Sequence, residues 1–407
     1  MLAPLRVALA AKPKYATTAG APLGPVLDRP MLPFRSCGPS VCVHARAVES
    51  LAPARRAFDD AFDLAVETLR IARPLLDGPR GGDPRLDVYV VDSGGDIAIG
   101  RDPLDRTLDR DAAPAFIAID PTIVREGGCV LSATAARAIV RASAAGVDIA
   151  ETPLVVDGLA RRIGELACPT RDATFGELQN KPYRALTATP SGTALLARTI
   201  DLQYGQGYGA IVPAVLSMAV NHRGVIVPTE GDELGPVHFH NDVTIFDVLS
   251  TTLTDAASSF DAVLLDVATV RALHPIAPAW EFVVPVSTLP RRFAIRRGIE
   301  PMGMTFLKID LDVAPKNDAI ELDLSWDMGA RFVWHVLKLD AAGKKIGEVP
   351  VPPLETTRKI SVDVRRLAGV ASIVLEGVNT GDPLRPFHPD EPPSHARGYE
   401  LGVFPGS

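Results

Sequence analysis

Ile320-Glu321-Leu322-Asp323-Leu324-Ser325-Trp326 alternates strictly between apolar and polar residues. Successive side chains of a β-strand point to opposite faces of its sheet, so this alternation predicts a strand with one buried and one solvated face. The pattern recurs at residues 332–336, which lead into the turn Asp340-Ala341-Ala342-Gly343. Short strands separated by turns at this spacing are typical of an antiparallel β-sandwich. We expect its further strands at residues 360–364, 371–378 and 399–404.

Upstream of residue 274 the apolar residues recur at three- and four-residue spacing, which is the period of an amphipathic helix. Residues 47–76 predict one long helix, and the turn-rich residues 77–84 end it. Two strands are predicted after this turn, at residues 86–91 and 116–119. Further helices are expected at residues 131–145, 153–167, 192–204, 210–221, 243–254 and 260–273.

These patterns predict an α+β, multi-domain protein with four segments. Residues 1–40 are proline-rich and weakly patterned, which indicates an extended arm. Residues 41–274 predict a mainly helical α/β domain with a small sheet. A proline-studded linker is expected over residues 275–303, and the antiparallel β-sandwich follows at residues 304–407.

The composition is that of an ordinary globular protein. Of 407 residues, 47% are apolar and 22% are charged. The 42 basic and 49 acidic residues give a net charge of −7 without any long run of Lys and Arg, so we expect no nucleic-acid partner. No apolar stretch reaches the roughly 20 residues that span a bilayer, so we do not expect a membrane-spanning chain. The apolar run Val7-Ala8-Leu9-Ala10-Ala11 is short for a signal peptide.

The four cysteines fall into two pairs. The stretch from Cys37 to Cys42 can close as a small turn, and Cys129 and Cys168 bracket two predicted helices, so we predict a disulfide in each pair. Buried reduced thiols are the alternative, because a chain of this size can accommodate them in its core. Disulfides favour an oxidising compartment, and we therefore expect an extracellular or periplasmic location.

Three stretches of the chain resemble a known group of proteins. They are Gly78-Pro79-Arg80-Gly81-Gly82-Asp83-Pro84-Arg85-Leu86-Asp87-Val88-Tyr89-Val90-Val91-Asp92, the helix behind Cys129, and Gly192-Thr193-Ala194-Leu195-Leu196 before Tyr204-Gly205. Together they resemble bacterial secreted zinc metallopeptidases of gluzincin-like fold, in which a catalytic front domain precedes a β-sandwich. The resemblance extends from about residue 41 to the C-terminus. It implies a metallopeptidase-like fold for residues 41–274.

The catalytic motif of that group is missing from this chain. Such enzymes carry H-E-x-x-H on a helix, where two imidazoles one turn apart bind zinc and the glutamate takes a proton from bound water. The corresponding residues 131–144 contain neither His nor Glu. The third ligand comes from E-G-x-A, and here that motif is Asp157-Gly158-Leu159-Ala160. Asp157 alone cannot hold a catalytic zinc, so the resemblance implies a degenerate member with Asp157 as a vestigial ligand position, no catalytic residue and no cofactor.

A relocated metal site is the alternative. His238 and His240 occupy alternate positions of Val237-His238-Phe239-His240-Asn241-Asp242, and alternate residues of an extended segment share one face. With Asp242 they form a candidate set of metal ligands. Equally, this segment can be a polar loop in which Asp242 caps the helix predicted at residues 243–254.

Three functions follow from these observations. The first is a catalytically inactive, metallopeptidase-like protein outside the cytoplasm, with a binding or structural role toward a protein or glycan partner. The second is a zinc metallohydrolase or peptidase whose ligands have moved to His238 and His240. The third is an intracellular scaffold with reduced cysteines. We favour the first because residues 131–144 lack the zinc ligands.

Overall fold

The computed structural model of this chain forms two compact units. Unit 2 comprises Ala173–Gly192, Ala257–His388 and Pro393–Ser407, and unit 1 comprises the remainder. The structure describes residues 27–103, 105, 107–110, 112–149, 151–169, 175–205, 207–220, 226–228, 237–239, 245–246, 248–249, 253, 258–327, 330–351, 358–381 and 396–406.

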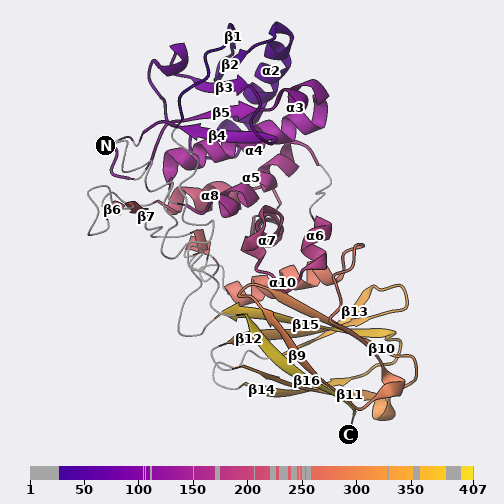
Figure 1. The fold of residues 1–407 in the computed structure, drawn as a ribbon. Coiled ribbons are helices and arrows are strands. Elements are labelled where there is room, and N and C mark those ends of the chain that lie inside the picture. Colours follow the sequence, from indigo (N-terminus) through magenta and orange to yellow (C-terminus); the bar gives the residue numbers. More distant parts are fainter. Residues whose placement is uncertain are drawn as a thin grey trace. The chain divides into compact units, whose positions relative to one another are not determined.

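Unit 1 is built on a five-stranded mixed sheet (Figure 1). The strands lie in the order β1 (Phe34–Cys37), β2 (Val41–Ala45), β3 (Leu86–Val90), β5 (Ala115–Ile119) and β4 (Ile97–Arg101). β2, β3 and β5 are parallel, whereas β1 and β4 are antiparallel edge strands. The two strands predicted here are confirmed as β3 and β5. β1 corrects the prediction of an extended arm over residues 1–40, because Phe34–Cys37 pairs with β2 in a hairpin that the Cys37–Cys42 disulfide closes.

Most helices that the structure describes in unit 1 lie where the periodicity predicts them, but the first one ends early and the short helix Pro121–Glu126 was not predicted. α2 (Leu51–Phe62) continues as a π-helical turn over Asp63–Thr68, and the chain then leaves the helix at Arg70, whose φ is 65°. The helix predicted over residues 47–76 is therefore too long, because a left-handed residue ends a right-handed helix. The other helices are α3 (Pro121–Glu126), α4 (Gly128–Val147), α5 (Pro153–Ala167), α7 (Pro190–Tyr204) and α8 (Ile211–Met218). The helix predicted at residues 243–254 lies largely outside the described residues.

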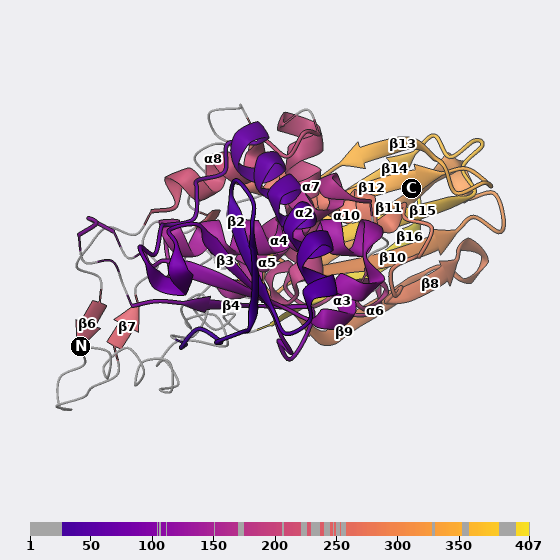
Figure 2. The ribbon, with the colours of Figure 1, turned by 90° about the horizontal axis from the view of Figure 1, so that it is seen from above.

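The two faces of this sheet are covered differently. α2 and α4 contact the sheet and each other, so they lie on the same face, and α5 packs on α4 as the next layer (Figures 1 and 2). Apolar strand residues such as Val43 and Val88 alternate with His44, Asp87 and Tyr89, which therefore point to the opposite face. Among the described helices, α4 alone is long and apolar enough to cross a membrane. However, 78% of its apolar window is buried inside the protein, as in the core helix of a globular domain.

Unit 2 contains the β-sandwich that the alternating pattern predicts. One sheet has the order β13-β12-β15-β10-β8 and the other has the order β14-β11-β16-β9. Apolar side chains from both sheets, among them Trp334 and Tyr399, form one core. The strands are β8 (Phe282–Pro285), β9 (Arg291–Ile299), β10 (Met304–Asp310), β11 (Ala319–Trp326), β12 (Arg331–Leu339), β13 (Lys345–Pro350), β14 (Lys359–Arg365), β15 (Ser372–Gly381) and β16 (Arg397–Pro405).

The linker predicted over residues 275–303 is wrong, because this segment supplies β8 and β9 to the two sheets. Pro285 ends β8 and Pro290 precedes β9, and both strands lie at sheet edges, where a missing N–H group is tolerated. The sandwich is also not wholly antiparallel, since β8 runs parallel to β10.

Two helices of unit 2 correct the domain boundary predicted at residue 274. α6 (Phe175–Asn180) and α10 (Phe260–Ala272) both belong to this unit, and α10 packs on β15 and β12. Gln179 joins the helices, because its amide donates to the carbonyl of Arg271 at 3.0 Å and its Oε1 accepts from Arg271 Nε at 3.0 Å. Both side chains are fully buried, so these hydrogen bonds fix α6 against α10.

Candidate functional site

α4 and α5 carry the positions at which the resemblance predicts a zinc site. The Cys129–Cys168 disulfide joins the first turn of α4 to the residue after α5, so the helices are antiparallel. Gly164 lets them approach closely, since a Cβ at this position would lie 3.0 Å from the Ala133 carbonyl oxygen. The predicted Cys37–Cys42 and Cys129–Cys168 disulfides are both present. As a result, the middle of α4 faces the first half of α5, where Asp157 lies.

Asp157 faces three guanidinium groups, and we call these four residues the arginine cluster. Arg137 Nη2 and Arg141 Nη1, both from α4, lie 3.4 and 3.7 Å from Asp157 Oδ1. Arg161, one turn along α5, places Nε 3.4 Å from Asp157 Oδ2. The four side chains are between 15% and 26% exposed. The cluster is thus half-buried, with one edge open to solvent.

The arginine cluster does not fit a zinc ion. Arg137 and Arg141 are four residues apart on α4, which is the spacing of the two histidines in H-E-x-x-H, and both face Asp157. A guanidinium group only donates hydrogen bonds and stays charged, so it repels a metal cation instead of coordinating it. The absence of His and Glu from this helix was recognised from the sequence, whereas the importance of its arginines was not. The signal for them was an i,i+4 Arg pair, whose members lie on one helix face.

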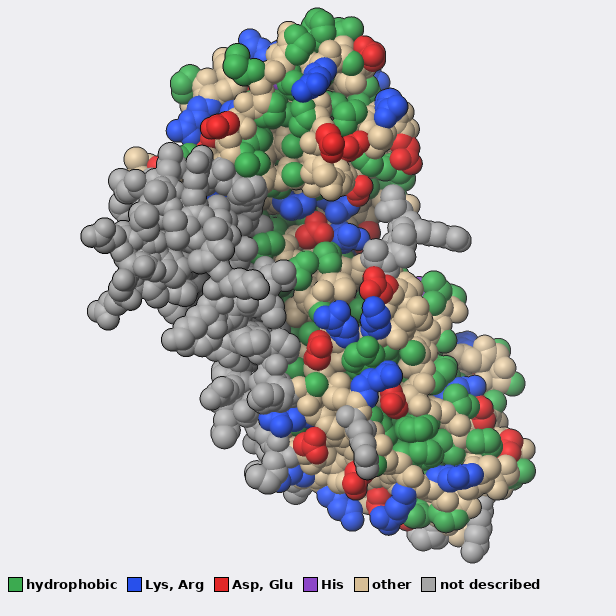
Figure 3. Space-filling model, viewed as in Figure 1, with side chains coloured by type: hydrophobic (Ala, Val, Ile, Leu, Met, Phe, Trp, Pro, Cys, Tyr) green, Lys and Arg blue, Asp and Glu red, His purple; other side chains and the backbone are tan. Residues whose placement is uncertain are grey.

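Within the arginine cluster, Asp157 is the carboxylate that the structure describes beside Arg141, and Arg141 shares it with Arg137 and Arg161. Besides Asp157, Arg137 reaches Asp96 at 3.7 Å, and Asp96 is 59% exposed. Burial lowers the pKa of Arg141, and although Asp157 raises it, the charges of Arg137 and Arg161 lower it further. At the level of α4 and α5, Figure 3 shows Lys and Arg side chains gathered around acidic ones. This arrangement favours an additional anion.

The relocated metal site is described only in part. His238 lies in β7 (Val237–Phe239), which pairs with β6 (Ile226–Pro228) and sets His238 opposite Val227. The extended backbone expected at His238 is therefore present. His240 and Asp242 lie outside the described residues, so the set of three ligands stays a prediction.

A second ionic cluster lies on the face of the unit 1 sheet that α2 and α4 do not cover. The guanidinium of Arg29 pairs with Asp77, with Asp87 and, at 2.8 Å, with Asp102. Asp87 is fully buried on the central strand β3, and its Oδ1 lies 2.8 Å from His44 Nε2. We call these five residues the acidic cluster. It anchors the segment around Arg29 to the sheet.

Three carboxylates share the Arg29 guanidinium in the acidic cluster, and the half-exposed Arg80 lies 3.1 Å from Asp102. Burial raises the pKa of Asp77 to about 7; Arg29 opposes this shift and Asp87 adds to it. Burial by itself would lower the pKa of Arg29, but the hydrogen bond and charge of Asp102, together with the other two carboxylates, raise it. Because a guanidinium already occupies the centre of the three carboxylates, we expect this cluster to have a structural role.

Cys37, Cys42 and Asp83 are the one group of described side chains whose potential metal-ligating atoms lie within 4.8 Å of one another. Cys42 Sγ lies 2.6 Å and Cys37 Sγ lies 3.4 Å from Asp83 Oδ2. Metal binding requires thiolates, and the two sulfur atoms are joined in a disulfide. In this oxidised form the group is a covalent staple of the β1–β2 hairpin.

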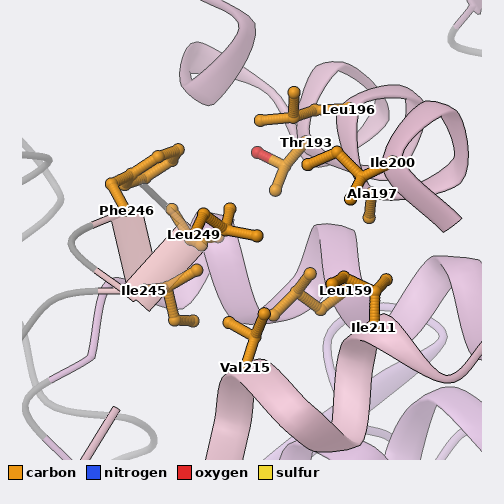
Figure 4. A pocket seen from close by; sticks show the side chains of 11 residues that line it. Leu159, Thr193, Leu196, Ala197, Ile200, Ile211, Val215, Ile245, Phe246 and Leu249 are labelled. Atoms are coloured by element: carbon orange, nitrogen blue, oxygen red, sulfur yellow. The ribbon is translucent and has the colours of Figure 1, made fainter. Parts of the chain in front are cut away.

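A small apolar cavity lies among α5, α7 and α8 (Figure 4). Its volume is about 10 Å³, and Leu159, Ile200 and Val215 are among its lining residues. Thr193 also lines it, and the buried hydroxyl of Thr193 has no hydrogen-bond partner among the described residues. A buried water molecule needs a cavity of roughly 10–15 Å³ and two to four polar partners, so this cavity is at the lower limit of size and offers too few partners. The cavity is therefore a packing gap and not a ligand site.

Thr269, His335 and Glu376 of unit 2 have the residue types of a hydrolase triad without its geometry. Thr269 Oγ1 donates to Glu376 Oε2 at 2.9 Å, and His335 Nδ1 lies 3.2 Å from the same oxygen. In a triad the acid and the nucleophile contact different imidazole nitrogens, whereas here both residues approach Nδ1. Burial raises the pKa of Glu376, and hydrogen bonds from His335 and Thr269 oppose the shift. The group fixes α10 on its sheet.

Comparison with known proteins gives no family assignment. No family model and no curated protein matches the chain. Among solved structures, the pre-peptidase C-terminal domain of collagenase from Bacillus anthracis is 10% identical, with a TM-score of 0.20 over 30% of this chain and 95% of that chain. The lectin domain of lectinolysin is 13% identical, with a TM-score of 0.17 over 27% and 70%. The copper-binding protein CorA of Methylomicrobium album BG8 is 8% identical, with a TM-score of 0.20 over 31% and 99%. Similarities this low carry no argument about function.

Proposed function

We propose that this protein is a catalytically inactive, metallopeptidase-like protein with a binding or structural role. The arginine cluster is the observation that carries the proposal. At the one-turn spacing where a zinc peptidase has two histidines, α4 has Arg137 and Arg141, and both pair with Asp157. A zinc peptidase requires three neutral or anionic ligands and an open coordination position. Two permanently charged guanidinium groups provide neither a metal ligand nor an open coordination position.

We propose a location outside the cytoplasm and a protein or glycan as the partner. Both cysteine pairs form disulfides, and disulfides persist mainly in oxidising compartments. Titration of free thiols in the denatured protein checks this part of the proposal. Four free thiols in protein purified without reductant would support the intracellular scaffold instead.

Restoring the ligands tests the proposal directly. The triple variant Arg137→His/Arg141→His/Asp157→Glu replaces two cations and a short carboxylate with the ligand types of a zinc peptidase. We expect the variant to bind zinc in calorimetric titrations, whereas the wild-type protein does not. Arg56→His is a matched control, because Arg56 is an exposed residue of α2 in the same unit. Zinc-dependent cleavage of a general peptide substrate by the wild-type protein would overturn the proposal.

A zinc metallohydrolase with ligands around His238 and His240 is the second candidate. The observation in its favour is the extended backbone at His238, which pairs with Val227 of β6. It predicts stoichiometric zinc in the wild-type protein, lost in His238→Ala and retained in Arg141→Gln. The first candidate predicts no zinc in any of the three proteins.

A further inference from the structure

We propose that the arginine cluster binds an oxyanion, namely the carboxylate or phosphate group of a ligand. This inference rests on the proposed function, because it names the ligand class of the same site. The cluster would recognise an anion where an active peptidase would hold a metal cation. Three features support it: the charge balance, the unused hydrogen-bond donors and the partial exposure.

The charge balance favours an added anion. Arg137, Arg141 and Arg161 share Asp157, and Arg137 also reaches the exposed Asp96. Among the described residues, Asp157 is the acidic partner of Arg141, at 3.7 Å. Like charges held together in a half-buried site destabilise one another, and an anion placed between them removes this repulsion.

The guanidinium donors are incompletely used. Charge-assisted hydrogen bonds between Arg and carboxylate have lengths of about 2.7–2.9 Å. The contacts to Asp157 are 3.4 Å from Arg137 and 3.7 Å from Arg141, and both reach the same oxygen. Arg137 Nε is also buried without a hydrogen-bond partner among the described residues. Each guanidinium carries several N–H donors in a planar fork, so donors remain for a second acceptor group.

The chemistry of these donors selects oxyanions. A planar fork of N–H groups matches carboxylate and phosphate oxygens bidentately, and Asp157 shows that a carboxylate is accepted at this place. The arginine side chains are 17–26% exposed, so a small anion can reach them from solvent. Partial burial also strengthens the attraction relative to a fully exposed Arg.

Calorimetric titration of the chelator-treated, full-length protein at constant ionic strength tests this inference. The probes are inorganic phosphate, acetyl-trialanine with a free carboxylate, and the same peptide with an amidated C-terminus. We expect saturable binding of phosphate, of the free-carboxylate peptide or of both, and none of the amidated peptide. Phosphate alone would indicate a free anion or phosphate group as the source, and the peptide alone would indicate a chain terminus.

Two variants separate recognition from non-specific salt effects. Arg141→Gln keeps a long helix-forming side chain and removes one cation, so we expect affinity to fall about tenfold. Asp157→Asn removes the internal competitor, so we expect affinity to rise roughly threefold to tenfold. Arg56→Gln removes the same charge from an exposed site on α2 and should leave the affinity unchanged.

Absence of saturable binding to the wild-type protein, or equal binding to wild type and Arg141→Gln, would overturn the inference. Weaker binding to Asp157→Asn would also contradict it, since a purely structural cluster loses order when its carboxylate is removed. Failure here is separate from failure of the proposed function. A protein that binds neither anion nor zinc still agrees with the proposed function, whereas bound zinc contradicts the proposed function itself.

Discussion

The arginine cluster and the acidic cluster of unit 1 combine guanidinium and carboxylate groups in opposite proportions, and the acidic cluster adds the imidazole of His44. In the first, three guanidinium groups surround the carboxylate of Asp157 at 3.4–3.7 Å. In the second, three carboxylates surround the guanidinium of Arg29, and the contact to Asp102 is 2.8 Å. The acidic cluster is closed and tight, whereas the arginine cluster is loose and reaches solvent.

The difference shows how burial assigns a role to a charged group. Asp87 is fully buried, so loss of its partner would leave an uncompensated charge in the interior. The arginines of α4 and α5 can be solvated when a partner is absent. We therefore expect the acidic cluster to stabilise the fold and the arginine cluster to be able to exchange partners.

The largest effect is expected from Arg29→Met. This variant keeps the volume of the side chain but leaves Asp77, Asp87 and Asp102 without their shared cation. We expect a loss of about 3–5 kcal/mol in the free energy of unfolding, measured with chemical denaturant. Arg56→Met is the matched control and should change stability by less than about 0.5 kcal/mol. A loss below about 1 kcal/mol for Arg29→Met would show that the acidic cluster is no anchor.

The next effect concerns the disulfide that ties α4 to α5. Cys129 and Cys168 are 39 residues apart, whereas Cys37 and Cys42 are 5 apart. Because a cross-link restricts the unfolded chain more when it closes a longer loop, we expect Cys129→Ala/Cys168→Ala to cost roughly 2–4 kcal/mol and Cys37→Ala/Cys42→Ala to cost less. The former variant should also weaken anion binding by loosening the arginine cluster. Equal losses of stability in the two variants would contradict the loop-length argument.

A smaller effect is expected from the pH dependence of the acidic cluster. The pKa of Asp77 is raised from 3.8 to about 7 in the folded protein, so the folded state binds a proton that the unfolded state has released. The resulting stabilisation is complete below pH 3.8 and is lost as the pH rises through about 7.

Asp77→Asn removes this dependence. At pH 8 the variant should be more stable than wild type by on the order of 1–2 kcal/mol, and the difference should shrink as the pH falls toward 4. Thermal unfolding between these pH values measures it. A constant difference at all pH values would contradict the raised pKa.

The smallest effect on stability is expected from Arg141→Gln. Its ion pair with Asp157 is long and partly exposed, so we expect a change of less than about 1 kcal/mol in the absence of added oxyanions. The same substitution should reduce oxyanion binding about tenfold. A large loss of stability would place the arginine cluster with the acidic one, as a structural feature of the fold.

Much of the fold could be predicted from the sequence, because periodic burial leaves a local pattern. α5 is found at the predicted residues Pro153–Ala167, and β11 is found where the alternation of residues 320–326 indicates a strand. β8 and β9 were missed because Pro285 and Pro290 lie beside them, and a proline at a sheet edge has the same local signature as a linker. The end of α2 depends on the backbone of Arg70, which periodicity does not reveal.

The candidate site could be predicted only in part. Asp157 was singled out because the resemblance places it at the E-G-x-A position. Its partners Arg137 and Arg141 come from the neighbouring helix, so they are recognised only once the packing of α4 on α5 is known. The acidic cluster joins residues from Arg29 to Asp102, a separation that no local pattern spans. Ion pairs between residues far apart in the sequence depend on the order of the strands in the sheet, so they can be predicted only when that order is known.

Elemental analysis of zinc in the natively purified wild-type protein, after dialysis against metal-free buffer, tests the central claim most directly. The proposal that Arg137 and Arg141 stand where a zinc peptidase has its ligands predicts that zinc is not retained in stoichiometric amount. Zinc near one atom per chain would contradict the account and would direct attention to His238 and His240.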